Sequence, residues 1–322
     1  MTPHLTTTQD QRICYGLPAD WLTGWMAAVG ATVVDPQLRL SWTEEEIPVA
    51  MFSHQKGHDP VKSLSEVWPS LGRRLDAMPG ARDATTNKND YSEISVKVFA
   101  DRLAGARNHP DAFSLTSSLT DLHWESSKEG DKAVYGPFET SGPGSTKWLH
   151  HRCRKVYSSV GDPTKGMEEM FDGVSQRIAD NGLGLDAGRI GAIRDSGETQ
   201  MVEPVVEGLA YFALALFPVR GAGKQVKASR GRQRGWGVGP YRDWDFIWPA
   251  WRQPLDRWGI DALLTAWHNT WRRSKRGKDD WIASRAEWDL LGIHTGWCTS
   301  RFKQRTSRDM TRGYGSQQID AY

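Results

Sequence analysis

The sequence predicts an α+β fold, in which an N-terminal part mixes helices with a small sheet and a basic, tryptophan-rich C-terminal part is mainly helical. Three observations predict it. Helical and alternating patterns follow one another in the first 52 residues. The run Glu203 to Phe217 is apolar nearly all round, which is typical of a central buried helix. The basic residues gather after that run. Two domains are expected, 1–160 and 161–322.

The first elements follow from local patterns. Residues 1–12 are polar and are expected to form a tail. Leu17 to Gly30 predicts a helix, because its large apolar side chains recur at helical spacing and Asp20 is available as N-cap. Gln37 to Trp42 alternates polar and apolar residues as a half-buried strand does, and Ile47 to Phe52 is a second apolar stretch after an acidic turn.

The rest of the chain is expected to alternate loops and helices. Residues 79–90, 125–146 and 182–191 are rich in glycine or small polar residues, which predicts loops. Further helices are predicted at Ser92 to Ala106, Thr146 to Tyr157, Glu203 to Phe217, Asp256 to Arg273 and Lys278 to Leu290.

Composition excludes several classes of protein. The chain has 322 residues, 38% of them apolar, which is enough for a folded core. Its longest apolar run, Val205 to Val219, is too short and too interrupted to span a bilayer. The N-terminus lacks the apolar core of a signal peptide. The three cysteines are far apart, which predicts a reducing compartment without a disulfide framework. A cytoplasmic protein without membrane contact is expected.

Charge is distributed unevenly along the chain. Residues 220–312 hold 20 Lys/Arg against 9 Asp/Glu, a balance of +11, whereas residues 1–219 hold 21 against 29, a balance of −8. Such an asymmetry indicates a polyanionic partner for the basic part. The acidic part is expected to face protein partners.

The strongest candidate site is the loop that follows the buried helix. Six basic residues occur there without an acidic one, and like charges at this density favour a solvated position along a phosphate backbone. Ten of the 16 tryptophans lie between Trp236 and Trp297, and basic residues interleaved with aromatic ones suit single-stranded nucleic acid. Packing is the expected role for most of these tryptophans, with Trp236 as the best candidate for stacking on a base. The loop contributes Arg220, Lys224, Lys227, Arg230, Arg232, Arg234 and Trp236.

Two further basic clusters follow within the same hundred residues. Neither is specific alone, but together with the loop they strengthen the prediction of phosphate contacts. The clusters are Arg272, Arg273, Lys275, Arg276 and Lys278, and then Arg301, Lys303, Arg305, Arg308 and Arg312.

A glycine-rich turn, residues 142–147, opens a predicted helix. Its Ser145 and Lys147 could help backbone amides hold a phosphate at the helix start. The spacing of its glycines is not that of a P-loop, and a simple capped loop explains the turn equally well.

No set of catalytic residues is evident. His54 and His58 lie four apart beside Gly57, and the group His150, His151 and Cys153 lacks a second pair at zinc-site spacing. We therefore expect no metal, no cofactor and no enzymatic activity. Two alternatives stay open: a magnesium-dependent nuclease that uses Asp243 and Asp245, and a DNA-binding regulator that acts alone.

The chain has Ala27-Ala28-Val29-Gly30 at the end of its first predicted helix and then Leu38-Arg39-Leu40-Ser41-Trp42. These motifs resemble the effector proteins of CRISPR type I-U/I-G systems, which open with a helix that ends near Ala-Ala-Leu-Gly and continue into a strand of the form Val-Arg-Leu-Arg-Trp. Further similar stretches are residues 16–26, 113–117, 137–142, 208–220, 246–251 and 254–255.

The resemblance implies a subunit of the Cascade surveillance complex in antiviral defence, in the position of the large subunit. Its implied partners are guide RNA, target DNA, the other Cascade subunits and the helicase-nuclease. Its implied roles are to read the motif that flanks the target, to hold the opened strands and to recruit that nuclease. The chain is short for a complete large subunit, so a C-terminal helical bundle is expected either to be missing or to come from another chain. No residue matches a motif-reading wedge, and none is assigned that role.

Overall fold

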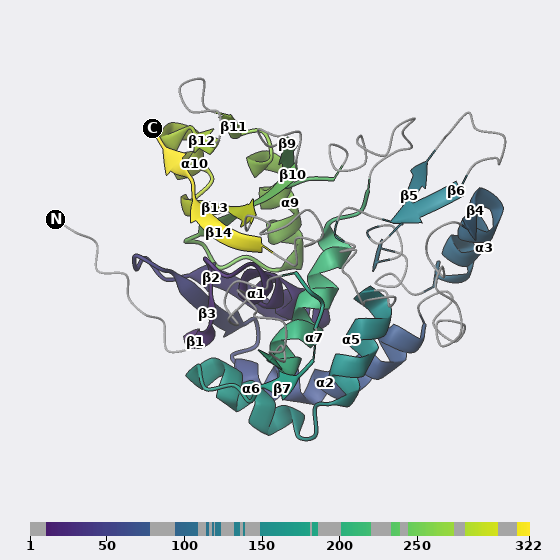
Figure 1. The fold of residues 1–322 in the computed structure, drawn as a ribbon. Coiled ribbons are helices and arrows are strands. Elements are labelled where there is room, and N and C mark those ends of the chain that lie inside the picture. The colour runs from purple at the N-terminus through teal and green to yellow at the C-terminus, as the bar shows by residue number, and fades with distance from the viewer. Residues whose placement is uncertain are drawn as a thin grey trace.

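The computed structural model shows a central helix pair with a sheet on one side and smaller elements around it (Figure 1). Two of its sheets come from the C-terminal third. The structure describes residues 11–77, 94–108, 114–115, 118, 120–123, 132–135, 138, 149–180, 182–185, 201–219, 233–238, 244–273, 281–301 and 314–322.

The N-terminal sheet is antiparallel and has the strand order β1-β3-β2. The two predicted strands are confirmed, with Arg39 opposite Ser53 in their register. The expected tail, by contrast, includes the start of an additional strand that pairs with β3. The strands are β1 (Gln11–Pro18), β2 (Leu38–Trp42) and β3 (Val49–His54).

Helices α1 (Leu22–Val34) and α7 (Pro204–Ala213) form the centre of the molecule, and every residue of both is buried. They approach closely at Gly30, where an added Cβ would lie 1.9 Å from the carbonyl oxygen of Leu209. Both were predicted, although α1 begins at Leu22 because β1 takes the residues up to Pro18, and Asp20 is not its N-cap. The 3-10 helix η2 (Leu214–Leu216) continues α7.

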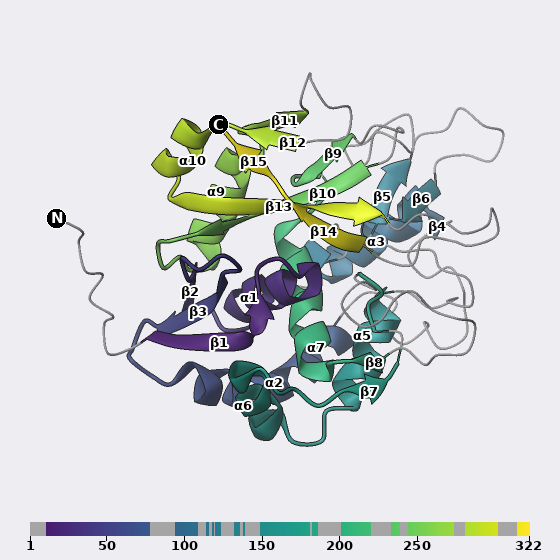
Figure 2. The same cartoon turned by 60° about the vertical axis from the view of Figure 1, so that its left-hand side comes forward.

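Three helices and a short ribbon pack around the lower half of α7, as Figures 1 and 2 show. Helix α2 has a regular N-terminus, with Asp59 as N-cap and Pro60 in its first turn. A second, small sheet lies beside α3. These elements are α2 (Pro60–Asp76), α5 (Leu149–Ser158), α6 (Pro163–Asp172), β7 (Ile178–Ala179), β8 (Met201–Val202), α3 (Val96–Gly105), β4 (Ile94–Ser95), β5 (Thr120–His123) and β6 (Lys132–Tyr135).

The C-terminal part is rich in strands, so the prediction of a mainly helical part was wrong. One sheet has the order β14-β13-β10-β9, and a second has the order β11-β12-β15. The helix expected at 256–273 ends at Trp267 and a strand follows, and the one expected at 278–290 is a strand and then a short helix. The elements are β9 (Trp236–Val238), β10 (Trp244–Trp251), α9 (Arg257–Trp267), β11 (Trp271–Arg273), β12 (Trp281–Ala283), α10 (Arg285–Leu290), β13 (Ile293–Arg301), β14 (Tyr314–Gln318) and β15 (Asp320–Ala321).

The four-stranded sheet β14-β13-β10-β9 is hereafter the C-terminal sheet. Tryptophan side chains join it to the N-terminal elements. The indole Nε1 of Trp25 donates to the carbonyl of Pro249 (2.8 Å), and that of Trp248 donates to the carbonyl of Ala19 (2.7 Å). One cluster of buried apolar residues extends from Cys14 to Ile319. The described core is therefore continuous across residue 160, and the division into domains there stays a prediction.

Candidate nucleic-acid interface

Most of the predicted contact residues fall outside the part of the chain that the structure describes. These are Arg220, Lys224, Lys227, Arg230, Arg232, Lys275, Arg276, Lys278, Lys303, Arg305, Arg308, Arg312, Ser145 and Lys147. Of the others, Arg272 is exposed on β11, and the backbone of Arg273 and Arg301 ends strands β11 and β13.

Arg234 lies in the interior, which corrects the expectation that it sits on a solvated loop. Only 7% of the residue is exposed. Its Nη1 donates to the carbonyl oxygen of Asp261 and to Oγ1 of Thr265, both at 2.7 Å. Its Nη2 contacts the Asp261 carboxylate and the Leu216 carbonyl. An arginine can be buried where a carboxylate and further acceptors satisfy its charge. Helix α9 supplies Asp261 and Thr265, and η2 supplies the Leu216 carbonyl.

Trp236 is also a core residue and not an exposed stacking platform. The residue is 3% exposed, and its ring lies 5.1 Å from that of Phe138 and 5.4 Å from that of Phe246. Trp236 is held among these rings because β9 pairs antiparallel with β10, which places Trp236 opposite Phe246. A ring held among aromatic neighbours in this way contributes to folding stability.

The described residues at the ends of the three basic segments lie close to one another in pairs. Strands β11 and β12 pair up to Arg273 and Trp281, on either side of 274–280. Strands β13 and β14 pair up to Arg301 and Tyr314, on either side of 302–313. At the base of 220–232, the Gln233 side chain donates to the carbonyl of Phe217.

Two of these three positions lie beside the start of β10, although β11 and β12 belong to the second C-terminal sheet. Strand β13 ends beside the start of β10, where the Phe246 amide donates to Oγ1 of Thr299 (2.9 Å). The start of β12 reaches the same place, because Trp281 Nε1 donates to the Asp245 carboxylate at 3.0 Å. Figure 2 shows β13 and β14 meeting at this end, with β9 and the start of β10 beside them. The topology thus attaches the clusters of 272–278 and 301–312 to neighbouring strands.

The candidate metal and catalytic groups have structural partners. Asp245 accepts the Trp281 bond, and Asp243 lies outside the described residues. The rings of His54 and His58 are stacked, with centroids 4.7 Å apart, and His54 Nδ1 accepts from the Lys56 amide. Within the described ranges, no three Asp, Glu, His or Cys side chains are grouped so as to hold a metal ion.

Of the group His150, His151 and Cys153, the first and last are fully buried and His151 is half-buried. His150 Nδ1 lies 2.9 Å from the Tyr211 hydroxyl, and burial lowers the pKa of His150 to about 3. Burial also raises the pKa of the Cys153 thiol well above its ordinary value, and Glu207 adds to that effect. A neutral imidazole and a protonated thiol at 0% exposure serve packing and not nucleophilic chemistry.

One concave feature was not anticipated from the sequence, namely a pocket between the starts of α6 and α7. Its lining comes from residues 159–178 and 203–205, which are too far apart in the chain for a local pattern to join them. The available signal was a pair of helix starts, Asp162-Pro163 and Glu203-Pro204, since proline favours the first turn of a helix.

Within the described residues, no helix is long and apolar enough to cross a membrane. Comparison with known proteins finds no matching family model, no matching curated protein and no matching solved structure.

Proposed function

We propose that the chain is a non-catalytic nucleic-acid-binding subunit of a CRISPR type I surveillance complex. In this role it takes the large-subunit position, contacts target DNA and its flanking motif, and recruits the helicase-nuclease. The family assignment rests on the motif resemblance. The nucleic-acid assignment rests on charge, because residues 220–312 carry a balance of +11.

The observation that carries the proposal is the placement of the strand ends. The described strand ends that flank 274–280 and 302–313 lie near the start of β10, and the two later clusters of basic residues belong to the sequence at and between those ends. Basic residues that act together release several counterions on binding, which gives nucleic acids a large share of their affinity for proteins. Arg234 and Trp236 are not part of this surface, and instead they fix the start of β9.

A binding and cleavage assay tests this function. The purified protein is titrated against labelled single-stranded DNA, duplex DNA and RNA, and each is then incubated with magnesium or manganese. We expect salt-dependent binding and intact strands. Cleavage that is lost in Asp243→Ala or Asp245→Ala would replace the proposal with the nuclease alternative.

The complex itself is tested by co-expression with the neighbouring genes. We expect the protein to co-purify with an RNA and with other subunits. A stable homodimer on one duplex site, without RNA, would favour the regulator that acts alone.

A further inference from the structure

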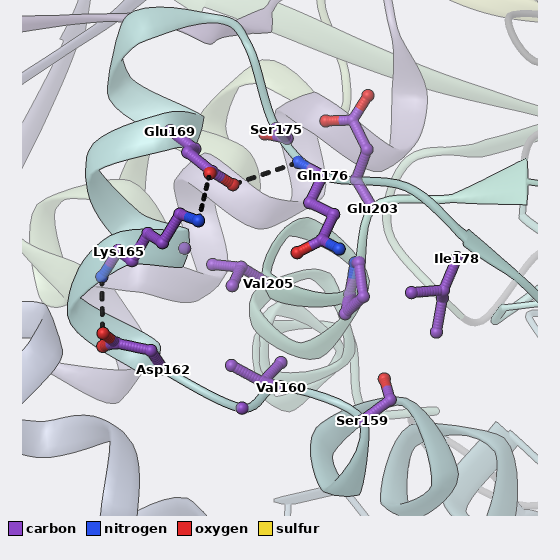
Figure 3. A pocket seen from close by; sticks show the side chains of 13 residues that line it. Ser159, Val160, Asp162, Lys165, Glu169, Ser175, Gln176, Ile178, Glu203 and Val205 are labelled. Carbon is purple, nitrogen blue, oxygen red and sulfur yellow. Dashed lines mark hydrogen bonds and ion pairs between the residues drawn. The ribbon is translucent and has the colours of Figure 1, made fainter.

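The pocket at the starts of α6 and α7 is lined by charged groups that are paired within the fold (Figure 3). Asp162 caps α6, and Glu169 lies 3.7 Å from the ammonium of Lys165. Glu203 is held by Arg177 outside the lining at 3.4 Å. The backbone of β14 is different, because part of it has no partner among the described residues.

Strand β14 is the outer strand of the C-terminal sheet and pairs with β13 on one side. In an antiparallel ladder, the N–H and C=O of alternate residues point toward the neighbouring strand, and those of the residues between point away from it. The Ile319 amide donates to the carbonyl of Gly296 (2.9 Å), which fixes the phase of this ladder. The backbone groups of Gln317 therefore point toward β13, and those of Ser316 and Gln318 point to the outer side.

The outer side of β14 is open within the part of the chain that the structure describes. Successive side chains of a strand lie on opposite faces, and Ser316, Gln317 and Gln318 are all exposed, so both faces of this strand are accessible. No described residue forms a backbone hydrogen bond with the outer groups of Ser316 or Gln318. An accessible row of unpaired donors and acceptors is a template for one further strand.

The composition of β14 determines which strand fits. Its sequence, Tyr-Gly-Ser-Gln-Gln, has neither the charges nor the proline that commonly protect an outer strand. Outer strands of other sheets carry charge, as Arg12 of β1, Arg272 of β11 and Asp320 of β15 do. A charged strand that meets its own copy places like charges opposite each other, whereas β14 places neutral amides and hydroxyls there.

We propose that β14 pairs antiparallel with β14 of a second copy of this chain, so that the two C-terminal sheets continue into one. A two-fold arrangement about Ser316 places that residue opposite itself and closes after two copies. The paired strand is short, so the association is weak, with a Kd on the order of 100 µM. It needs no nucleic acid, which distinguishes it from the stable homodimer on a duplex site that a regulator would form.

Sedimentation equilibrium of the full chain without nucleic acid tests the pairing, at about 10 to 500 µM protein. We expect the wild type to pass from monomer to dimer across this range. Ser316→Lys and Ser316→Glu are each expected to raise the Kd about fivefold, because like charges then lie opposite each other. An equimolar mixture of these two variants should restore the wild-type Kd or lower it, since opposite charges then meet.

Two further variants distinguish strand pairing from other contacts. Ser316→Pro removes an outward N–H and should also weaken the dimer, whereas the fold is kept because an outer strand tolerates proline on its solvent side. Ser158→Lys adds the same charge as Ser316→Lys at an exposed position of α5 and should leave the Kd unchanged. Thermal melts verify that each variant folds.

Three results would each overturn the proposal. The first is a wild type that stays monomeric, which would leave the edge to a strand of a different protein. The second is a dimer that Ser316→Lys weakens no more than Ser158→Lys does. The third is a mixture of Ser316→Lys and Ser316→Glu that pairs no better than either variant alone.

Discussion

The central helix pair is fully buried and the C-terminal sheet is buried along most of β10, but the two are held in different ways. Helices α1 and α7 approach each other through a small residue, so that at Gly30 one backbone lies against the other. The sheet is attached through tryptophans: Trp248 donates to the Ala19 carbonyl and Trp251 to that of Leu40 (2.9 Å), while Trp25 of α1 donates back to Pro249. These three tryptophans therefore connect the sheet to the N-terminal elements.

The difference separates two signals that coincide in the sequence. Of the ten tryptophans between Trp236 and Trp297, seven are buried, Trp271 is half-buried and Trp258 is 69% exposed, while the side chain of Trp244 is outside the described set. Among the basic residues of the predicted surface, Arg272 is exposed and Arg234 is buried, while Arg273 and Arg301 mark strand ends that lead into basic segments. In the proposed function, charge is responsible for binding and the tryptophans are responsible for the fold.

The largest expected effect comes from removing a sheet tryptophan. Trp236→Ala is expected to lower the free energy of unfolding by about 3–5 kcal/mol, because it leaves a cavity among Phe138, Phe246 and their neighbours. Trp258→Ala, at an exposed position, is the matched control and should change it by about 0.5 kcal/mol or less. Urea unfolding of both variants measures this. Similar losses of unfolding free energy in Trp236→Ala and Trp258→Ala would contradict the claim that the buried tryptophans stabilise the fold and the exposed one does not.

The folding stability of the core around α7 is expected to fall in acid because of His150, which lies on α5 and contacts Tyr211 of α7. The pKa of His150 in the folded state is about 3, below the value near 6.5 of an unfolded chain, so the unfolded state binds more protons between these pH values. Stability should therefore fall as pH drops below about 6.5, by about 2 kcal/mol between pH 7 and pH 5 from this group.

The variant His150→Asn isolates that contribution. Burial also lowers the pKa of His294, to about 4, so the wild type retains other acid-sensitive groups. The difference in unfolding free energy between pH 7 and pH 5 should be smaller in the variant by about 2 kcal/mol. An unchanged difference would mean that His150 reaches solvent, and that the core around α7 is less tightly closed than described.

A smaller effect is expected at a helix cap. Asp256 accepts from the Gly259 amide (2.9 Å) and begins α9 beside the C-terminal sheet. Asp256→Ala should lower the unfolding free energy by about 1 kcal/mol. Nucleic-acid affinity should stay the same, since the role of this carboxylate is in folding. A clear rise or fall in affinity at constant salt would extend the binding surface to α9.

The sequence predicted the regular parts of the fold and missed those that depend on distant partners. Strand β2 follows from its alternating pattern, strand β3 from an apolar stretch after an acidic turn, and helix α7 from a long apolar run. Strand β10 was not predicted, and Pro249 within it is unusual for a central strand. The structure accommodates it because β9 pairs only with Trp244 to Phe246, so no β9 carbonyl lies opposite the missing N–H.

The candidate site shows the same limit. The burial of Arg234 requires Asp261, which lies 27 residues away, and a carbonyl of Leu216. No local pattern connects these groups, so a charge-rich segment was interpreted as wholly solvated. The charge asymmetry itself needed no structure, because it is a property of the composition.

The proposed binding of nucleic acid by the C-terminal charges is tested most directly by the salt dependence of duplex DNA binding in two triple variants. Lys303→Ala, Arg305→Ala and Arg312→Ala remove three charges from the C-terminal part. Lys56→Ala, Lys62→Ala and Arg73→Ala remove three exposed charges from the N-terminal part and keep the net charge equal. If the first three contact phosphates, the slope of log affinity against log salt should fall by about two to three units, because each contact contributes about 0.9. The N-terminal triple should keep the wild-type slope. Equal slopes in all three proteins would contradict the claim that the C-terminal charges bind nucleic acid.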